Sequence, residues 1–111
     1  MWIMVAGPYT AGGADAAMRA ARPAQMNRAA LALFRLGHVP VIGVNMALPI
    51  IATAEGDAFD EVMMPLSLAL ADRCDAVLRI GGGSAGADAE LARFAAAGKP
   101  VFRDVGEVPP A

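Results

Sequence analysis

Short apolar runs alternate along the chain with stretches in which apolar residues recur every three or four positions. Residues 2–7 (WIMVAG) form a continuous apolar run that ends at glycine and proline, as is typical of a buried parallel strand. Similar runs at 38–44, 76–80 and 100–104 predict three more strands. Pro40 indicates that the second strand lies at an edge of the sheet, because proline cannot donate a hydrogen bond to a neighbouring strand.

Helical periodicity fills most of the sequence between these runs. The expected helices cover residues 22–36, 59–70 and 84–97. Pro23 suits the first turn of the first helix, and Gly37 and Gly98 suit left-handed C-caps. Pro65 is expected to kink the second helix or split it in two. Residues 45–57 have no clear period and are expected to form a mobile connection, and the tail after residue 104 is expected to be a loop.

Strands joined by helices favour right-handed crossovers and a parallel sheet covered on both faces. The pattern therefore predicts a small Rossmann-like, flavodoxin-like α/β fold: a three-layer sandwich around a four- to five-stranded parallel sheet. At 111 residues the chain is long enough for one compact domain and too short for two, so residues 1–111 are expected to form a single domain.

Composition excludes several classes of function. The net charge is −2 and the nine basic residues are scattered, so no basic stripe is available for nucleic acid. A single cysteine, Cys74, leaves no internal disulfide and fits a reducing cytoplasm. The sequence has no apolar run of about 18 residues, as a membrane span needs, and no signal-peptide pattern. No cluster of His, Cys, Asp and Glu has metal-ligand spacing, so no metal site is expected.

Two glycine-rich segments, AGPYTAGG and GGGSAGA, are expected at the carboxyl edge of the sheet, where ligands bind in open parallel sheets. Ser84 is a candidate N-cap, and the first amides of the following helix could hold a phosphate or a carboxylate. Alternatively, the glycines could merely form a tight turn from strand to helix. The segment has neither the lysine of a P-loop nor the position of a dinucleotide-binding motif.

Glu90 follows Ser84 by six residues, in the second turn of the expected helix. One small ligand could contact both residues if it carried a phosphate at one end and an electrophilic carbon about a sugar's width away. The alternative is a solvated glutamate on an alanine-rich helix.

The order AGPY, LGHVPV, RCDAV and SAGADAE resembles the nucleoside 2-deoxyribosyltransferase superfamily, in particular its small 2'-deoxynucleoside 5'-phosphate N-hydrolases. The resemblance extends over about residues 3–104. Its most specific element is Ser-x-Gly-x-x-x-Glu, which Ser84, Gly86 and Glu90 provide.

The resemblance implies an enzyme that hydrolyses an N-glycosidic bond without a cofactor, with Glu90 as the nucleophile at C1′. At position 84 the family's transferases have an aspartate, whereas its nucleotide hydrolases have a serine that binds the 5′-phosphate. Ser84 therefore favours a nucleoside 5′-monophosphate as substrate, with the deoxynucleotide as the preferred form. The implied substrate-binding residues are Gly7, Pro8, Gly12, Ser67, Ser84, Ala85 and Gly86.

Two positions depart from the family's pattern. Met4 stands where the family carries a strand tyrosine. Ser67 stands where it carries an aspartate that helps to protonate the leaving base or to orient the nucleophile. Tyr9 is the candidate replacement for the missing phenol as a catalytic group, although it could also stack on the base or pack locally. Asp60 lies on the helical face of Ser67 but seven residues earlier, about 10 Å along the axis.

These departures keep other functions open. The chain could be a nucleotide-binding module without turnover, or a deoxyribosyltransferase, which Ser84 disfavours. A relationship to cytokinin-activating phosphoribohydrolases is disfavoured by the spacing of the glycines and the absence of a threonine. Because members of the superfamily usually associate through helices beside the cleft, a homodimer is expected.

Overall fold

The computed structural model of the chain describes residues 1–9 and 16–111. In this part of the chain, one sheet contains four strands: β1 (Trp2–Ala6), β2 (Val39–Val41), β3 (Ala76–Arg79) and β4 (Val101–Phe102). All neighbouring pairs are parallel and the strand order is β2-β1-β3-β4. The predicted parallel α/β sandwich is confirmed, and so is the edge position of the strand that contains Pro40.

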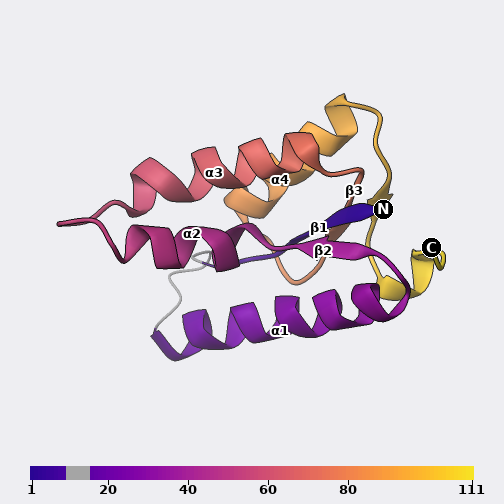
Figure 1. The fold of residues 1–111 in the computed structure, drawn as a ribbon, viewed down its shortest axis with the longest axis horizontal. Helices are drawn as coiled ribbons and strands as arrows, with labels where there is room; N and C mark the ends of the chain where they lie inside the picture. The colour runs from indigo at the N-terminus through magenta and orange to yellow at the C-terminus, as the bar shows by residue number, and fades with distance from the viewer. Residues whose placement is uncertain (10–15) are drawn as a thin grey trace.

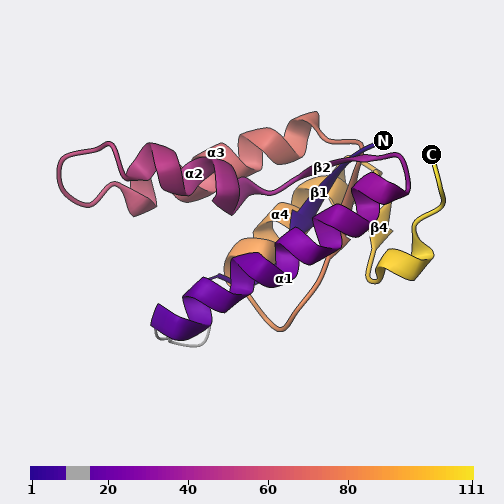
Figure 2. The same cartoon turned by 60° about the horizontal axis from the view of Figure 1, so that its bottom comes forward.

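The helices lie on both faces of the sheet (Figure 1). They are α1 (Ala16–Arg35), α2 (Gly43–Ile51), α3 (Phe59–Arg73) and α4 (Ala85–Ala96). Because β2 and β3 lie on opposite sides of β1, right-handed crossovers place α1 on one face and α3 with α4 on the other. The α2–α3 hairpin extends beyond the sheet, as both views show (Figures 1 and 2).

Two apolar clusters hold the layers together. The first joins Ile3, Val5 and Leu78 of the sheet to Leu33 of α1, and continues to the α2–α3 hairpin. The second packs the opposite side chains of the central strands against α3 and α4, with the fully buried Phe94 of α4 among them. β1 and β3 are thus covered on both faces, which explains why their sequences are continuous apolar runs.

The start expected for the first helix and the possible split of the second are wrong, whereas a kink at Pro65 stays a prediction. The first helix begins at Ala16, six residues before Arg22, so Pro23 lies inside it. The high helix propensity of the alanines in this segment accounts for the longer helix. The second expected helix is one continuous α3 that includes Pro65, so it is not split.

Two segments expected to be irregular contain helices. The expected mobile connection includes most of α2, whose Val44, Ala47, Leu48 and Ile51 have helical spacing and pack on the first cluster. The tail includes a short 3-10 helix, η2 (Val105–Glu107), with Asp104 as its capping residue. The C-caps were predicted correctly, since Gly37 and Gly98 have φ values of 94° and 70°.

Contacts at the amino edge of the sheet join the two ends of the described chain. His38 is 3% exposed, and its Nε2 donates a hydrogen bond to the Pro109 carbonyl (2.7 Å). Its Nδ1 then accepts from the amino group of Met1 (2.8 Å). Asp75 accepts a hydrogen bond from the Trp2 amide at 2.8 Å, which fixes the start of β3 beside β1. These polar groups lie at the edge opposite the carboxyl ends of the strands, so they serve the fold.

Candidate functional site

A cavity of about 250 Å³ opens at the carboxyl ends of β1 and β3, where the strand order reverses. Ligands bind at this topological switch point in open α/β sheets. The volume lies near the lower end of small-molecule pockets. The lining residues are Val5, Gly7, Tyr9, Met26, Ile42, Gly43, Val44, Phe59, Asp60, Met63, Met64, Ser67, Ser84, Gly86, Ala87 and Glu90.

The start of α4 forms one end of this cavity. Ser84 is the N-cap, as predicted, and its Oγ accepts a hydrogen bond from the Ala87 amide at 3.2 Å. The amides of Ala85 and Gly86 precede the first intrahelical hydrogen bond, so they have no carbonyl partner within the helix. Together with the helix dipole, they give this end of the cavity a partial positive charge.

Glu90 lies one turn deeper on the same helix. The buried residues of α4 are Ala87, Glu90 and Phe94, which form one stripe against the sheet and α3. Glu90 is 8% exposed and lines the cavity, and no hydrogen bond to its carboxylate is found within residues 1–9 and 16–111. Burial raises the pKa of Glu90 to about 7, although the nearby charge of Arg79 lowers it in part. Near neutral pH, this carboxyl group is therefore present in both ionisation states.

α3 forms the wall opposite α4. A Cβ atom on Gly86 would lie 3.3 Å from Met64 Sδ, so the two helices pack closely at this level. Asp60 lies one turn nearer the mouth than Met64, and Ser67 lies about one turn deeper. The unsplit α3 thus brings both Asp60 and Ser67 to the cavity that contains Glu90. For Asp60 this was not expected from the sequence, because it precedes Ser67 by seven residues.

An aromatic pair borders the mouth. The ring of Tyr9 stacks on that of Phe59, with centroids 6.2 Å apart and an interplanar angle of 20°. Both residues line the cavity. Aromatic faces at this position could hold a flat heterocycle.

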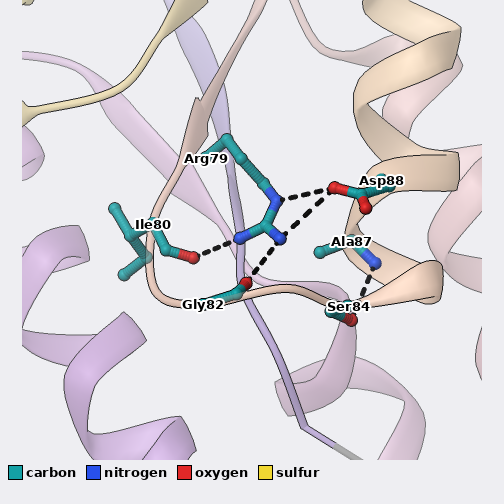
Figure 3. A network of polar contacts seen from close by, with 6 residues as sticks. All are labelled: Arg79, Ile80, Gly82, Ser84, Ala87 and Asp88. Carbon is teal, nitrogen blue, oxygen red and sulfur yellow. Dashed lines mark hydrogen bonds and ion pairs between the residues drawn. The ribbon is translucent and has the colours of Figure 1, made fainter. Parts of the chain in front are cut away.

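A buried cation contacts the glycine loop (residues 80–83), which connects β3 to Ser84 and α4 (Figure 3). Arg79 ends β3 and is 6% exposed. Its Nη1 donates to the carbonyl of Ile80, and its Nη2 donates to the carbonyl of Gly82 at 2.7 Å. The guanidinium also contacts Asp88 Oδ1 of α4 through Nε at 3.4 Å and Nη2 at 3.3 Å. Arg79 therefore ties the glycine loop to the first turn of α4.

The other predicted site residues occupy several positions. Gly7, Tyr9, Ser67, Ser84, Gly86 and Glu90 line the cavity together. Pro8 contacts the glycine loop instead: Gly81 has a φ of 76°, and a Cβ on it would lie 2.7 Å from Pro8 Cδ. Ala85 is exposed at the start of α4. Gly12 lies outside the described residues.

Met4 and Ser67, which differ from the pattern of the superfamily that the sequence resembles, have different surroundings. Met4 is fully buried in the second apolar cluster, so its side chain brings no polar group to the cavity. Ser67 is 3% exposed and packs against Gly43, where a Cβ atom would lie 2.3 Å from Ser67 Oγ. Gly43 thus allows the start of α2 to approach α3 at the back of the cavity.

Arg79 was missed as a site residue from the sequence. The sequence feature that could have identified it is a basic residue in the last position of an otherwise apolar strand, followed by Ile80 and three glycines. The contacts that reveal its role depend on how the loop folds back, which spacing alone does not show.

Two kinds of feature are absent from the described residues: a cluster of metal ligands and a membrane-spanning helix. The described ranges contain no group of three or more His, Cys, Asp or Glu side chains placed to hold a metal ion. Among the helices described, none is both long and apolar enough to cross a membrane.

Comparison with known proteins gives the family of the chain. No curated protein sequence matches it significantly. Residues 1–104, nearly the whole chain, match a family described as a domain of unknown function, DUF1937. The chain belongs to the DUF1937 family.

Proposed function

We propose that the protein hydrolyses the N-glycosidic bond of a nucleoside 5′-monophosphate, preferably a deoxynucleotide, and releases the free base and the sugar phosphate. The observation that supports this most is that a buried carboxylate, Glu90, shares one cavity with the Ser84-capped start of α4. The two features match the two ends of the proposed substrate: an anion and an electrophilic carbon.

The substrate's phosphate would lie at the start of α4. The amides of Ala85 and Gly86 can donate to phosphate oxygens, and Ser84 adds a neutral side chain where an aspartate would repel the anion. Asp88 in the same turn carries a negative charge, but it is paired with Arg79. The proposed preference for a nucleotide over a nucleoside rests on this balance of charges and on the resemblance to nucleotide hydrolases.

In the proposed reaction, a Glu90 oxygen forms a bond to C1′ while the glycosidic bond breaks and its electron pair leaves with the base. The base takes up a proton, and a glycosyl ester remains on Glu90. Water then attacks C1′, loses a proton and displaces the carboxylate. The net reaction consumes one water and needs no oxidant, reductant or metal.

The proton transfers need a second group. Among the described residues that line the cavity, Asp60 carries the one carboxyl group other than that of Glu90. We assign to Asp60 the proton transfer to the leaving base. Phe59 precedes Asp60 directly in α3, and the stacked Tyr9–Phe59 pair lines the same cavity, where the base would stack.

A second candidate function is nucleotide binding without turnover. Met4 and Ser67 favour this alternative. The superfamily that the sequence resembles has a tyrosine and an aspartate at these positions, and neither the buried Met4 nor Ser67 can supply their acid–base chemistry. The cavity and the start of α4 would be retained under this alternative, but Glu90 would have no catalytic role.

We also propose that the protein is a homodimer. Large apolar side chains are exposed on α1 (Leu31 and Phe34) and on α2 (Met46 and Ile50), and each pair lies on one helical face. Light scattering at micromolar concentration tests this, and a monomer would contradict it. The expected location is the cytoplasm, where the single buried Cys74 would stay reduced.

The decisive experiment incubates the protein with ribo- and deoxynucleoside monophosphates and their parent nucleosides, and measures released base by chromatography. Hydrolysis predicts base release from monophosphates that Glu90→Gln abolishes and the exposed control Glu55→Gln preserves. New nucleosides that appear only with an added acceptor base would indicate transfer. Binding of nucleotides without any product would favour the binding module and overturn the proposed hydrolysis.

A further inference from the structure

The glycine loop presents two of its amides on the side away from Arg79. In a planar trans peptide, the carbonyl of one residue and the N–H of the next point in opposite directions. The carbonyls of Ile80 and Gly82 both accept hydrogen bonds from the guanidinium of Arg79 (Figure 3). The N–H groups of Gly81 and Gly83 therefore point away from Arg79. No hydrogen bond from either amide is found among the residues that the structure describes.

Burying a guanidinium in this place is costly unless its donors are satisfied. Arg79 follows Val77 on the face of β3 that packs against α4, a row that is otherwise apolar. Its contacts are two backbone carbonyls of the glycine loop and the carboxylate of Asp88, which is 65% exposed. The planar guanidinium group of arginine suits these three acceptors, because its N–H groups donate in fixed directions.

We propose that Arg79 is a positioning residue that fixes the glycine loop in an anion-binding conformation, with the Gly81 and Gly83 amides supplementing the start of α4. The inference deepens the proposed function, since it concerns the same phosphate. Arg79 does not itself contact the substrate in this proposal, because it does not line the cavity and its guanidinium is directed at the loop carbonyls and Asp88.

The charge of Arg79 also acts on the cavity. It favours the ionised form of Glu90 and lowers its pKa against the larger effect of burial. The other titratable groups around the cavity are Tyr9 and Asp60, and Asp88 faces Arg79 from α4. Changes at Arg79 should therefore move two observables, anion affinity and the titration of Glu90, that a merely stabilising residue would leave in place.

The test compares Arg79→Lys, Arg79→Met and Asp88→Asn with the wild type. Affinity for inorganic phosphate at fixed pH is measured by NMR titration, and the pKa of Glu90 by its carboxyl carbon resonance. Arg79→Lys keeps the charge but not the planar guanidinium group, so we expect phosphate affinity to fall at least tenfold while the Glu90 titration stays near its wild-type midpoint. Arg79→Met should weaken phosphate binding similarly and move the midpoint to higher pH.

Asp88→Asn covers the case in which a change of the buried arginine prevents folding. It removes the charged partner at an exposed position and should weaken phosphate binding several-fold. Its matched control is Asp72→Asn, which breaks the exposed ion pair between Asp72 of α3 and Arg93 of α4 (2.8 Å) and should leave phosphate binding unchanged.

Equal phosphate affinity in the wild type, Arg79→Lys and Asp88→Asn would overturn the inference. So would weakened binding that Asp72→Asn reproduces. Neither measurement requires turnover, so this inference can hold even if the proposed hydrolysis fails. An anion site that depends on Arg79, in a protein that releases no base, would support the inference and contradict the proposed role of Glu90.

Discussion

The burial of Glu90 predicts that Glu90→Gln stabilises the protein at neutral and alkaline pH. In the folded chain, the pKa of this carboxyl is raised from 4.5 to about 7 because burial disfavours the charged form. Between these two values the folded state binds more protons than the unfolded state, so the wild type loses stability as the pH rises. Glutamine has nearly the same shape and carries no charge, and thus avoids this loss.

The magnitude follows from the shift. A difference of one pKa unit corresponds to about 1.4 kcal/mol, so the full penalty for ionising Glu90 is roughly 3 kcal/mol. It is absent below pH 4.5, grows between pH 4.5 and 7, and is constant above. At pH 8, Glu90→Gln should exceed the wild type by this amount, which for a domain of this size raises Tm by roughly 10 °C.

The assay is denaturant unfolding at a series of pH values between 4.5 and 8.5, with the free energy of unfolding compared at each pH. The difference between variant and wild type isolates Glu90, because the other titrating groups are common to both. Glu55→Gln, at an exposed loop position, is the matched control and should show no pH-dependent difference. A difference for Glu90→Gln that stays flat across this range, or a less stable variant at pH 8, would refute the argument that Glu90 is held in a desolvated position.

Three further predictions concern the cavity. The value of kcat/KM for base release should fall about tenfold per unit below pH 7, because the nucleophile Glu90 must be ionised. Asp60→Asn should lower kcat by about 10² to 10⁴ without unfolding the protein, as a rate assay with circular dichroism would show. Gly43→Ala should destabilise the fold by about 1 to 3 kcal/mol in denaturant unfolding, because its Cβ would lie 2.3 Å from Ser67 Oγ, and Ser67→Ala should restore part of the loss.

Matched variants exist for the last two changes. Glu61→Gln alters a neighbouring carboxylate of α3 that does not line the cavity, and an equal loss of kcat in both variants would argue against a role for Asp60. Gly82→Ala adds a Cβ with no atom within 4 Å and should cost less than about 0.5 kcal/mol. A Gly43→Ala variant as stable as Gly82→Ala would show that α2 can move away from α3 without cost.

The fold was predictable where its signals are local. The central strands are apolar on both faces, and the step from β3 to α4 is marked by glycines followed by the N-cap Ser84. α2 was missed even though Val44, Ala47 and Ile51 have helical spacing, because Pro49 interrupts the segment and its other residues are almost all apolar, so that no polar face marks the period. The start of α1 was missed because an alanine-rich segment shows no apolar period at all.

The candidate site was predictable only along single helices. The distance from Ser84 to Glu90 follows from helix geometry, and both residues line the cavity. The position of Asp60 depends on how α3 lies against α4, and that depends on the close contact between Gly86 and Met64. The role of Arg79 depends on the return of the glycine loop over the end of β3. Such tertiary relationships leave no periodic trace in the sequence.

The distribution of buried polar residues gives an independent argument for where the function lies. In the described part of the chain, the buried polar or charged residues are His38, Ser67, Arg79 and Glu90. His38 is satisfied by the two ends of the chain, whereas the other three surround the cavity or its glycine loop. An apolar side chain in place of Glu90 would complete the stripe between Ala87 and Phe94 and would remove a penalty of roughly 3 kcal/mol. Because the fold alone would be more stable without this carboxylate, packing does not account for its presence, which supports the proposed role of Glu90 in the cavity.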